Sequence, residues 1–464
     1  MMVSVDIGST YTKGAVFRLD GGHMALVRRS ETPTTQDDLW RGFSEVLGGL
    51  IEAGSDKDLR EISRNMPVRF SSSAKGGLRV VAVGLVPELT VEAARVAAFS
   101  AGGKVVGVFT HRLSRQDMKR LEALNPDVVL LTGGTDGGNE RIVAMNAESL
   151  GASAYRGPVV FAGNLKALDA VAGAIPPGRL VVAANVMPDI GRLEVDEARE
   201  AIRRVFVKEI VKGKGLDKIA KVVDSEPQPT PLGVFKLTQV IAERQSEWRS
   251  MAIVDLGGAT TDFYSAVPAS REEPGDVVRG FDERGVKRTV EGDLGLRVSA
   301  ATALEAMGAR KEREAVSLGI KAADVEAYVC RSAEEPSFLS AHDNHALVEL
   351  LLAKLCIGGA AERHAGRRRG VWTSSGKVMT RRGRDLRHVT RLIGTGGYLA
   401  RSSDRQVYAL ACDGPHLAED EGILLPESPD LYRDADHLFP LLGNVVAESP
   451  EAVVEMAVSV IKQL

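Results

Sequence analysis

The chain opens with two runs of apolar and β-branched residues that are separated by a tight turn. Met2 to Ile7 and Thr12 to Leu19 flank the turn sequence Gly8-Ser9-Thr10. Runs of this kind, bounded by glycine and hydroxyl residues, are typical of β-strands joined in a hairpin. The pattern returns at Met251 to Leu256, which a second strand-like run from Asp262 to Val267 follows. The recurrence predicts that one strand–turn–strand unit occurs twice.

Between Ser71 and Pro188 the pattern changes to short apolar strands that alternate with helical segments. Alternation at this spacing favours a parallel sheet with crossover helices. We therefore expect an inserted α/β subdomain over residues 71–190. Its strand candidates are Arg79 to Val86, Val105 to Phe109, Asp127 to Thr132, Val159 to Ala162 and Leu180 to Asn185.

The remaining segments complete two lobes. Pro227, Pro229 and Pro231 form a breaker cluster that predicts a joint between domains. A helical region is expected from Leu294 to Leu355, and a closing helix from about Ser449-Pro450 to Leu464. We assign residues 1–70 and 191–250 to the first lobe and residues 251–464 to the second.

One stretch, Arg363 to Arg391, carries ten arginines and lysines. A solvated loop or hairpin with acidic partners nearby is the favoured interpretation, and a dedicated anion site is the alternative.

Composition narrows the classes of partner. The chain has 464 residues, 44% hydrophobic and 26% charged, which is ordinary for a globular protein of two to four domains. The net charge of −3 gives no basic footprint, so we expect neither nucleic acid nor an anionic membrane as partner. The three cysteines show no metal spacing and indicate a reducing compartment. With no signal-like start or apolar run of membrane length, we expect a cytoplasmic protein.

The two turns carry the candidate chemistry. Asp6 to Lys13 and Asp255 to Asp262 each place an acid at the end of a strand, then glycine, then hydroxyl residues. Glycine lets backbone N–H groups approach phosphate oxygens, and hydroxyls add donors. The carboxylates would repel phosphate, so a cation such as Mg²⁺ must lie between them. A hairpin with an ordinary turn acid is the alternative, but two such loops 249 positions apart favour a shared site.

A third motif follows in order. Leu392 to Leu399 is an apolar strand that leads through Gly394-Thr395-Gly396-Gly397 into a helix. Glycine turns before helices are common. In this order, after two phosphate loops, the turn lies where the backbone would pack against adenosine.

In this order the motifs resemble the actin, heat-shock chaperone and sugar-kinase superfamily. The resemblance implies a duplicated actin-like ATPase fold of class α/β, with two lobes of mixed five-stranded sheets and nucleotide between them, plus the inserted subdomain. A narrower resemblance, over nearly the whole chain, is to the MutL-type accessory protein encoded with glutamate mutase, not the mismatch-repair protein of that name. Its motifs are Asp6 to Lys13, Ser73-Ala74-Lys75-Gly76-Gly77-Leu78, Leu130 to Asn139, Val290 to Gly295 and Leu424-Leu425-Pro426.

The resemblance implies roles for individual residues. Asp6 and Asp255 would hold Mg²⁺ through water, and Lys13 would pair with the β- or γ-phosphate unless it is a surface lysine. These three are the expected catalytic residues. The expected ATP ligands are Gly8, Ser9, Thr10, Thr12, Lys13, Gly257, Gly258, Ala259, Thr260, Thr261, Glu291, Gly394, Thr395, Gly396 and Gly397.

Several roles stay open. Asp262 could position water or metal, or cap its turn. Glu291 could contact ribose or metal, while Asp293 could equally cap a helix. Asp136 and Asn139 are candidates for the catalytic base, although a plain turn is favoured for their glycine-rich loop.

The implied function is ATP-driven assistance to an adenosylcobalamin-dependent mutase, as in reactivating chaperones that exchange damaged cofactor. The expected partners are the mutase subunits, and formation of a homodimer is left open. A small-molecule kinase and a nucleotide-sensing module that does not hydrolyse ATP are the alternatives. An iron–sulfur dehydratase activator is disfavoured because Cys330 and Cys356 lack a glycine-rich setting.

Overall fold

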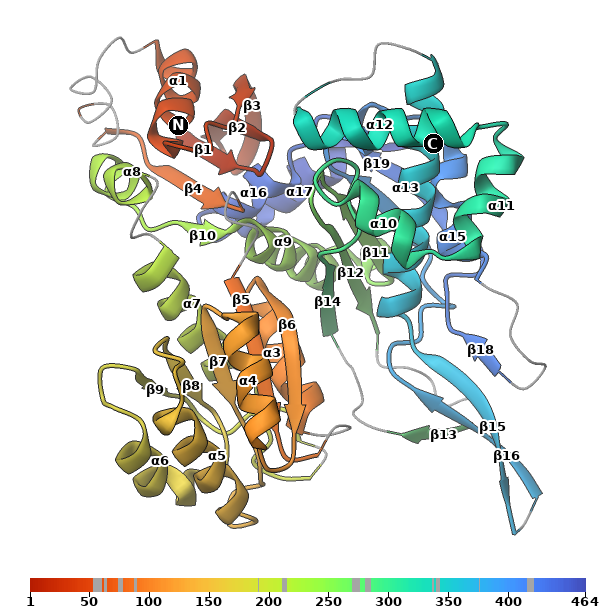
Figure 1. The fold of residues 1–464 in the computed structure, drawn as a ribbon. Coiled ribbons are helices and arrows are strands. Elements are labelled where there is room, and N and C mark those ends of the chain that lie inside the picture. Colours follow the sequence, from red (N-terminus) through yellow and green to blue (C-terminus); the bar gives the residue numbers. More distant parts are fainter. Residues whose placement is uncertain are drawn as a thin grey trace.

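The computed structural model places two lobes side by side and hangs a separate α/β domain and a long β-hairpin beneath them (Figure 1). It describes residues 1–52, 61, 65–73, 78–86, 90–190, 192–210, 215–268, 276–279, 285–335, 338, 343–374, 376–414 and 421–464. Residues 74–77 of the Ser73 to Leu78 motif therefore lie outside the described part.

The first lobe is built on a mixed sheet of strand order β10-β4-β1-β2-β3. β1 pairs antiparallel with β2 and parallel with β4, while β3 extends the antiparallel side. Helix α1 packs on this sheet through Trp40, Phe43, Leu47 and Leu50, whose three- and four-residue spacing forms one apolar face. The elements are β1 (Met2–Ile7), β2 (Tyr11–Asp20), β3 (His23–Pro33), α1 (Leu39–Ile51), β4 (Val68–Ser72), α7 (Asp196–Ile210), α8 (Leu216–Val223) and β10 (Gln228–Pro229).

The second lobe repeats this order as β14-β12-β11-β17-β19 and adds β20 at the end. Its first hairpin is again antiparallel, and β17 and β19 again run parallel to it. The repeat confirms the duplicated fold predicted from the two turns. The sheet has six strands instead of the expected five, because the segment predicted as the end of a closing helix forms β20. The strands are β11 (Met251–Leu256), β12 (Thr261–Val267), β14 (Gly285–Glu291), β17 (Arg391–Thr395), β19 (Asp430–Asp434) and β20 (Ile461–Gln463).

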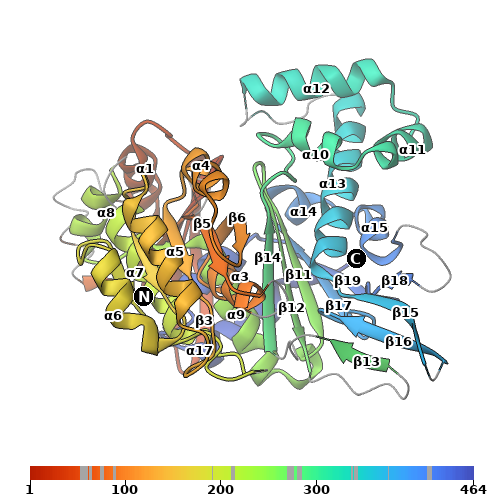
Figure 2. The same cartoon turned by 60° about the horizontal axis from the view of Figure 1, so that its bottom comes forward.

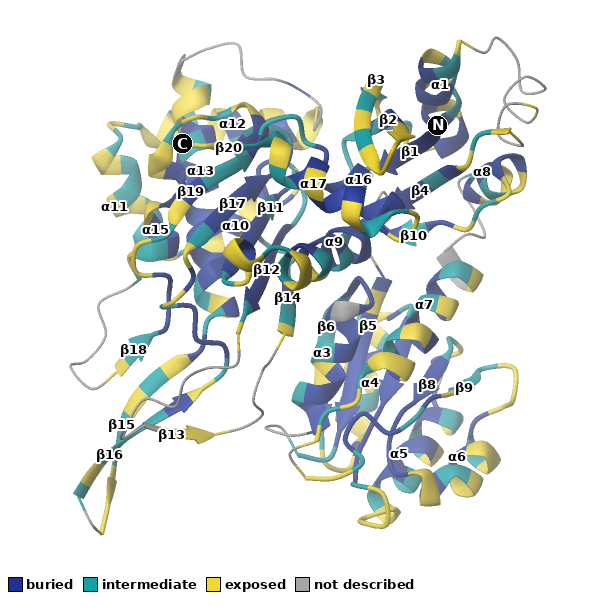
Figure 3. Cartoon of the chain, turned by 180° about the vertical axis from the view of Figure 1, so that it is seen from behind, coloured by how far each residue is buried: buried dark blue, intermediate teal, exposed yellow. Residues whose placement is uncertain are grey.

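Helices α9 (Thr230–Arg244), α16 (Phe439–Val445) and α17 (Pro450–Val460) lie between the lobes. Their side chains share a buried cluster with Phe17 of the first sheet and Tyr264 of the second. Figure 3 shows α9 and α16 at the centre of the molecule, where α16 is buried throughout and α9 becomes exposed toward its C-terminal end. The proline cluster leads directly into α9, because Gln228 and Pro229 form β10 and Pro231 lies in the first turn of the helix.

The inserted domain, Leu78 to Val182, has a fully parallel sheet of order β6-β5-β7-β8-β9, as the alternating pattern predicted. Helix α7 carries Ile202 and Phe206 into a cluster shared by this domain and the first lobe. The elements are β5 (Leu78–Gly84), α3 (Glu92–Ser100), β6 (Gly103–Thr110), α4 (Arg115–Leu124), β7 (Val128–Leu131), α5 (Arg141–Ala152), β8 (Val159–Phe161), α6 (Leu168–Ala174) and β9 (Leu180–Val182).

A group of helices covers the second sheet and projects above it (Figure 2). The longest helix, α13, is long and apolar enough over Asn344–His364 to span a membrane. However, 72% of its most apolar stretch is buried inside the protein. It is the core helix of this lobe. The helices are α10 (Ala300–Ala306), α11 (Ala309–Ser317), α12 (Ala322–Glu334), α13 (Asp343–His364), α14 (Gly397–Arg401) and α15 (Ala409–Cys412).

The basic stretch forms a hairpin, one of the two structures expected for it. Two short strands border its base, and the distal part extends as a two-stranded ribbon (Figure 1). Trp372 pairs with Lys377 near the end of this ribbon. Arg381 and Arg387 donate to the carboxylate of Asp385 at 2.7 and 2.8 Å, which gives the stretch an acidic partner of the kind that the favoured interpretation expects. The strands are β13 (Asp276–Arg279), β15 (Arg367–Thr373), β16 (Gly376–Arg382) and β18 (Glu421–Ile423).

Candidate functional site

The two predicted turns are closed by the same backbone hydrogen bond. The N–H of Gly8 donates to the carbonyl of Tyr11 at 3.0 Å, and the N–H of Gly257 donates to that of Thr260 at 2.9 Å. In the strand registers Asp6 lies opposite Lys13, and Asp255 lies opposite Asp262. The lobes therefore present equivalent acids, but a lysine faces the first acid and a third carboxylate faces the second.

The turns meet across a cavity of about 340 Å³. A Cβ built on Gly258 would lie 3.2 Å from Cγ2 of Thr10, so the tips of the two loops are in direct reach of each other. The cavity is within the size range of small-molecule sites. The predicted residues that line it are Asp6, Gly8, Ser9, Thr10, Lys13, Asp255, Gly257, Gly258, Ala259, Thr260, Asp262, Gly396 and Gly397.

Five of the predicted ligands lie outside the cavity wall. Thr12 and Thr261 are buried on the opposite side of their strands, bonded to Thr34 and to the carbonyl of Leu294. Strand alternation explains both, because their neighbours Lys13 and Asp262 face the cavity. The other three are Glu291, which pairs with Arg363, Gly394, which packs beneath Tyr408, and Thr395, which donates to Asp434.

The loop that supplied the candidate bases lies elsewhere. Asp136 follows β7 in the inserted domain and accepts hydrogen bonds from Asn185 Nδ2 at 3.0 Å and the N–H of Leu165 at 3.1 Å. Asn139 accepts from the N–H of Ile142 at 3.0 Å, at the start of α5. Neither residue lines the cavity, so the favoured interpretation of a structural turn fits both.

Asp6 is held by two hydroxyl donors. Ser71 Oγ and Thr230 Oγ1 donate to its Oδ1 at 2.8 and 2.5 Å. Burial raises the pKa of Asp6, while these hydroxyls and the charge of Lys13 lower it. Because both donors bind one oxygen, the protein fixes the carboxylate without using the second oxygen in these bonds.

Asp255 has a less favourable setting for its charge. Burial, followed by the charges of Asp262 and Asp6, raises its pKa to about 7, which Lys13 only partly offsets. Mutually repelling carboxylates around a cavity favour a bound cation. Among the described residues, no group of three or more His, Cys, Asp or Glu side chains is arranged to hold a metal. A cation would therefore need further oxygens, and Mg²⁺ characteristically takes these from phosphates and water.

Lys13 contacts a residue that sequence reasoning missed. Its Nζ lies 2.7 Å from Nδ1 of His437, which precedes α16. Burial is the main cause that lowers the pKa of Lys13, against the charges of Asp6, Glu31 and Asp255. Burial also lowers the pKa of His437 well below its usual value, and Lys13 adds to this.

Other wall residues were also missed, among them Thr230, Arg297, Phe338 and Tyr398. A signal for part of this wall exists in the sequence. Pro231-Leu232-Gly233 begins α9, and Pro440-Leu441-Leu442-Gly443 begins α16, so the duplication extends to the two helices between the lobes.

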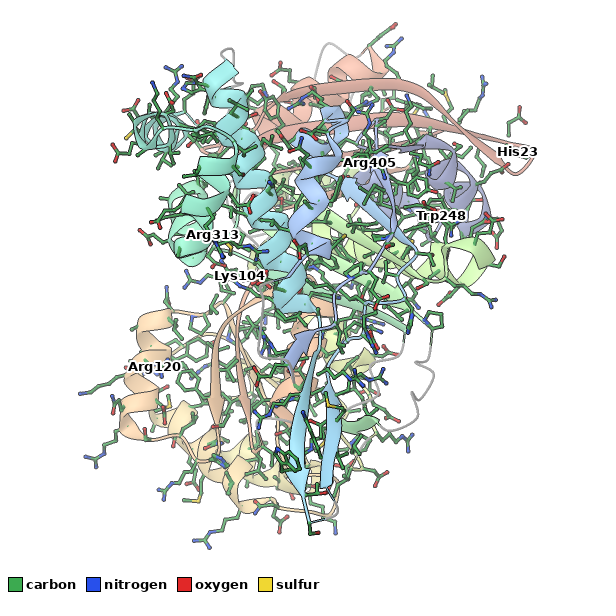
Figure 4. All side chains as sticks on the ribbon, turned by 90° about the vertical axis from the view of Figure 1, so that its right-hand side faces the viewer. His23, Lys104, Arg120, Trp248, Arg313 and Arg405 are labelled. Atoms are coloured by element: carbon green, nitrogen blue, oxygen red, sulfur yellow. The ribbon has the colours of Figure 1, made fainter. Side chains whose placement is uncertain are left out.

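The inserted domain contacts the second acidic loop through Arg288. Its Nε donates to Asp262 Oδ1 at 2.8 Å, and its Nη1 donates to the carbonyls of Phe99 at 2.7 Å and Gly103 at 3.2 Å. Lys104, also of the inserted domain, lies against Gly292 at the same junction (Figure 4). One buried guanidinium thus joins a cavity carboxylate to another domain.

Two lobes of one topology, whose paired acidic loops face a common cavity, define a protein of the actin-like ATPase fold. The chain belongs to the MutL protein family, whose model matches residues 2–461. It is 34% identical over 457 residues to Protein MutL of Clostridium tetanomorphum, and the aligned region covers 97% of each chain. The family suggested by the sequence motifs is confirmed.

Solved structures of several proteins superpose loosely on the chain. Nucleotide-free diol dehydratase-reactivating factor gives 10% identity and a TM-score of 0.36, covering 97% of this chain and 100% of that one. Glycerol dehydratase reactivase gives 9% and 0.35 with the same coverage. Acetone carboxylase gives 10% and 0.40, covering 96% and 70%. The sheet order, and not these likenesses, defines the fold.

Proposed function

We propose that the protein binds ATP with Mg²⁺ between its two acidic loops and hydrolyses it to remodel an adenosylcobalamin-dependent mutase. The observation that carries the nucleotide part is the cavity into which the loops at Asp6 and Asp255 both open. A triphosphate bridging them would bring glycine backbone and hydroxyl donors from each lobe to its oxygens.

The carboxylates would hold the cation and the glycine turn would hold the nucleoside. Asp6 and Asp255 are the proposed Mg²⁺ residues through bound water, and the ion would neutralise phosphate charge. Gly396 and Gly397 are the proposed neighbours of adenosine. Gly396 has φ +102°, and a Cβ there would lie 2.3 Å from the carbonyl of Leu256, so the turn needs glycine.

Family membership and the motifs shared with the glutamate mutase accessory protein support the mutase as partner. In this proposal, ATP turnover changes the relative position of the lobes and the inserted domain, and this change releases the damaged cofactor from the mutase. A cytoplasmic location fits this role and the sparse cysteines.

The test uses the full chain, MgATP and an adenosylcobalamin-dependent mutase inactivated by damaged cofactor. We expect the mutase to stimulate ATP hydrolysis. We also expect release of the damaged cobalamin, which is measured by its absorption spectrum. Asp255→Ala and replacement of ATP by ADP serve as controls and should abolish release. Turnover that requires a small acceptor instead of the mutase would overturn the proposal and indicate a kinase.

A further inference from the structure

Lys13 and His437 form a contact that the loop chemistry alone does not require. Lys13 lies on β2, and His437 lies in the turn between β19 and α16, 424 positions away in the sequence. Among the described residues, no carboxylate oxygen lies within 4.0 Å of the ammonium of Lys13, so the imidazole is its partner.

The turn that carries His437 is rigidly built. Asp434 is buried and accepts from Thr395 Oγ1 and from the N–H groups of Leu438 and Phe439, each at 2.9 Å. The N–H of His437 donates back to the carbonyl of Asp434 at 3.1 Å. His437 itself has φ +49°, a left-handed conformation that costs energy for most side chains. A rigid turn with an unfavourable backbone angle at one residue suggests that the side chain there is needed in that position.

The charges around Lys13 show why a neutral partner matters. Asp6, Glu31 and Asp255 attract the ammonium, and Arg401 repels it. Arg29 and Arg401 also face His437, and together with burial they keep its imidazole neutral. If the ammonium formed an ion pair with a carboxylate, the negative charge of that partner would offset its attraction for a phosphate. A neutral acceptor occupies one of its three N–H groups and leaves the charge and two donors for a ligand.

We propose that His437 is a positioning residue that holds the ammonium of Lys13 toward the phosphates of the bound nucleotide. The inference rests on the proposed nucleotide-binding function. It also assigns a role to the turn before α16, because the helix between the lobes would sense the phosphates through this one hydrogen bond.

The test compares His437→Asn with His437→Gly in the full chain. Both residues tolerate a left-handed backbone, but only asparagine offers an acceptor near the position of Nδ1. The probes are MgATP and adenosine, titrated by calorimetry, with thermal unfolding of the nucleotide-free variants as a control of folding. If the glycine variant does not fold, His437→Asp replaces it: aspartate also tolerates a left-handed backbone, and its carboxylate should pair with the ammonium and weaken MgATP binding while adenosine binding stays unchanged.

We expect His437→Asn to bind MgATP within about threefold of the wild type, and His437→Gly to lose about tenfold or more, as for hydrogen bonds to charged groups. Adenosine affinity should stay unchanged, since adenosine has no phosphate for Lys13. In a Lys13→Met background the glycine substitution should add no further loss.

Two results would overturn the positioning role while leaving nucleotide binding intact. One is wild-type affinity for MgATP in His437→Gly. The other is an equal loss of MgATP and adenosine affinity, which would indicate a structural role only. A wild-type protein that binds no MgATP would overturn the proposed function as well.

Discussion

Asp6 and Asp255 occupy equivalent positions in two hairpins, but the protein surrounds them differently. Asp6 receives hydrogen bonds from Ser71 and Thr230, which stabilise its charge. Asp255 faces other acids, and its pKa is raised to about 7. Burial raises the pKa of both carboxyls, but only that of Asp6 is offset by hydroxyl donors, so the cavity is short of positive charge on the side of Asp255. A cation should correct this imbalance at Asp255.

The raised pKa of Asp255 predicts how the free energy of unfolding changes with pH. Because an unfolded aspartate titrates near 3.9, the folded protein binds more protons at this residue between about pH 4 and pH 7. The free energy of unfolding should therefore fall as pH rises through that window, in the absence of Mg²⁺ and nucleotide. Asp255→Asn removes this pH-dependent contribution of Asp255 to the free energy of unfolding. The melting temperature of the variant minus that of the wild type should therefore increase from pH 5 to pH 7.5. A difference in melting temperature that stays constant with pH would contradict the raised pKa.

At this scale the sequence identified which loops form the site but not all of its wall. The choice between Lys13 and Thr12, or between Asp262 and Thr261, follows from strand alternation and was within reach of sequence reasoning. Thr230 and His437 were not, because their contacts join positions 224 and 424 apart that only the finished fold brings together.

The crossing of α9 and α16 depends on two glycines. A Cβ on Gly443 would lie 2.4 Å from the carbonyl carbon and 2.5 Å from the oxygen of Gly233. The helix backbones therefore touch with no room for a methyl group. Because this crossing lies between the lobes, it is where a change in their relative position would be accommodated.

Gly443→Ala should lower the melting temperature, although alanine favours helix by about 1 kcal/mol over glycine. Backbone atoms cannot yield as a flexible side chain can, so the clash should exceed the gain in helix propensity. Gly173→Ala on α6 is the matched control, because a Cβ there meets nothing within 4 Å and should be neutral or stabilising. Equal melting temperatures for the two variants would contradict the close crossing.

Among the elements, the hairpins and the parallel sheet could be predicted because their signals are local. Alternating strands and helices at short spacing allow few other arrangements. The pairing of β13 and β18 with the long hairpin could not be predicted, since both strands are short and distant in sequence. The final strand β20 was missed because Ile461 to Gln463 continues an apolar helical pattern and only pairing with β19 makes it a strand.

A buried charge links the second lobe to the inserted domain. Arg288, 3% exposed, bonds Asp262 at the cavity and two carbonyls of the inserted domain. The inserted domain and the wall of the cavity therefore share one guanidinium. Insertion of an α/β domain was predictable from the sequence, but its docking was not, because one arginine in a strand carries no signal of its partners.

Arg288→Met should destabilise the protein by roughly 3 to 5 kcal/mol, because it leaves the carboxylate of Asp262 buried without its partner. Thermal unfolding and limited proteolysis of the inserted domain would measure the loss. The double variant Arg288→Met/Asp262→Asn should recover part of it, since no unpaired charge remains. Arg313→Met, on the exposed helix α11 (Figure 4), is the control and should change little. Wild-type stability in Arg288→Met would show that the contact is dispensable.

We expect one nucleotide to lie between both acidic loops together with a cation. This expectation is tested by calorimetric titration of ATP into wild type, Asp6→Ala and Asp255→Ala, each with Mg²⁺ and with chelator. Binding to the wild type should be saturable and should need Mg²⁺, and either substitution should abolish it. Melting temperatures of the free proteins show whether the variants are folded. Full retention of Mg²⁺-dependent binding in both variants would contradict this expectation.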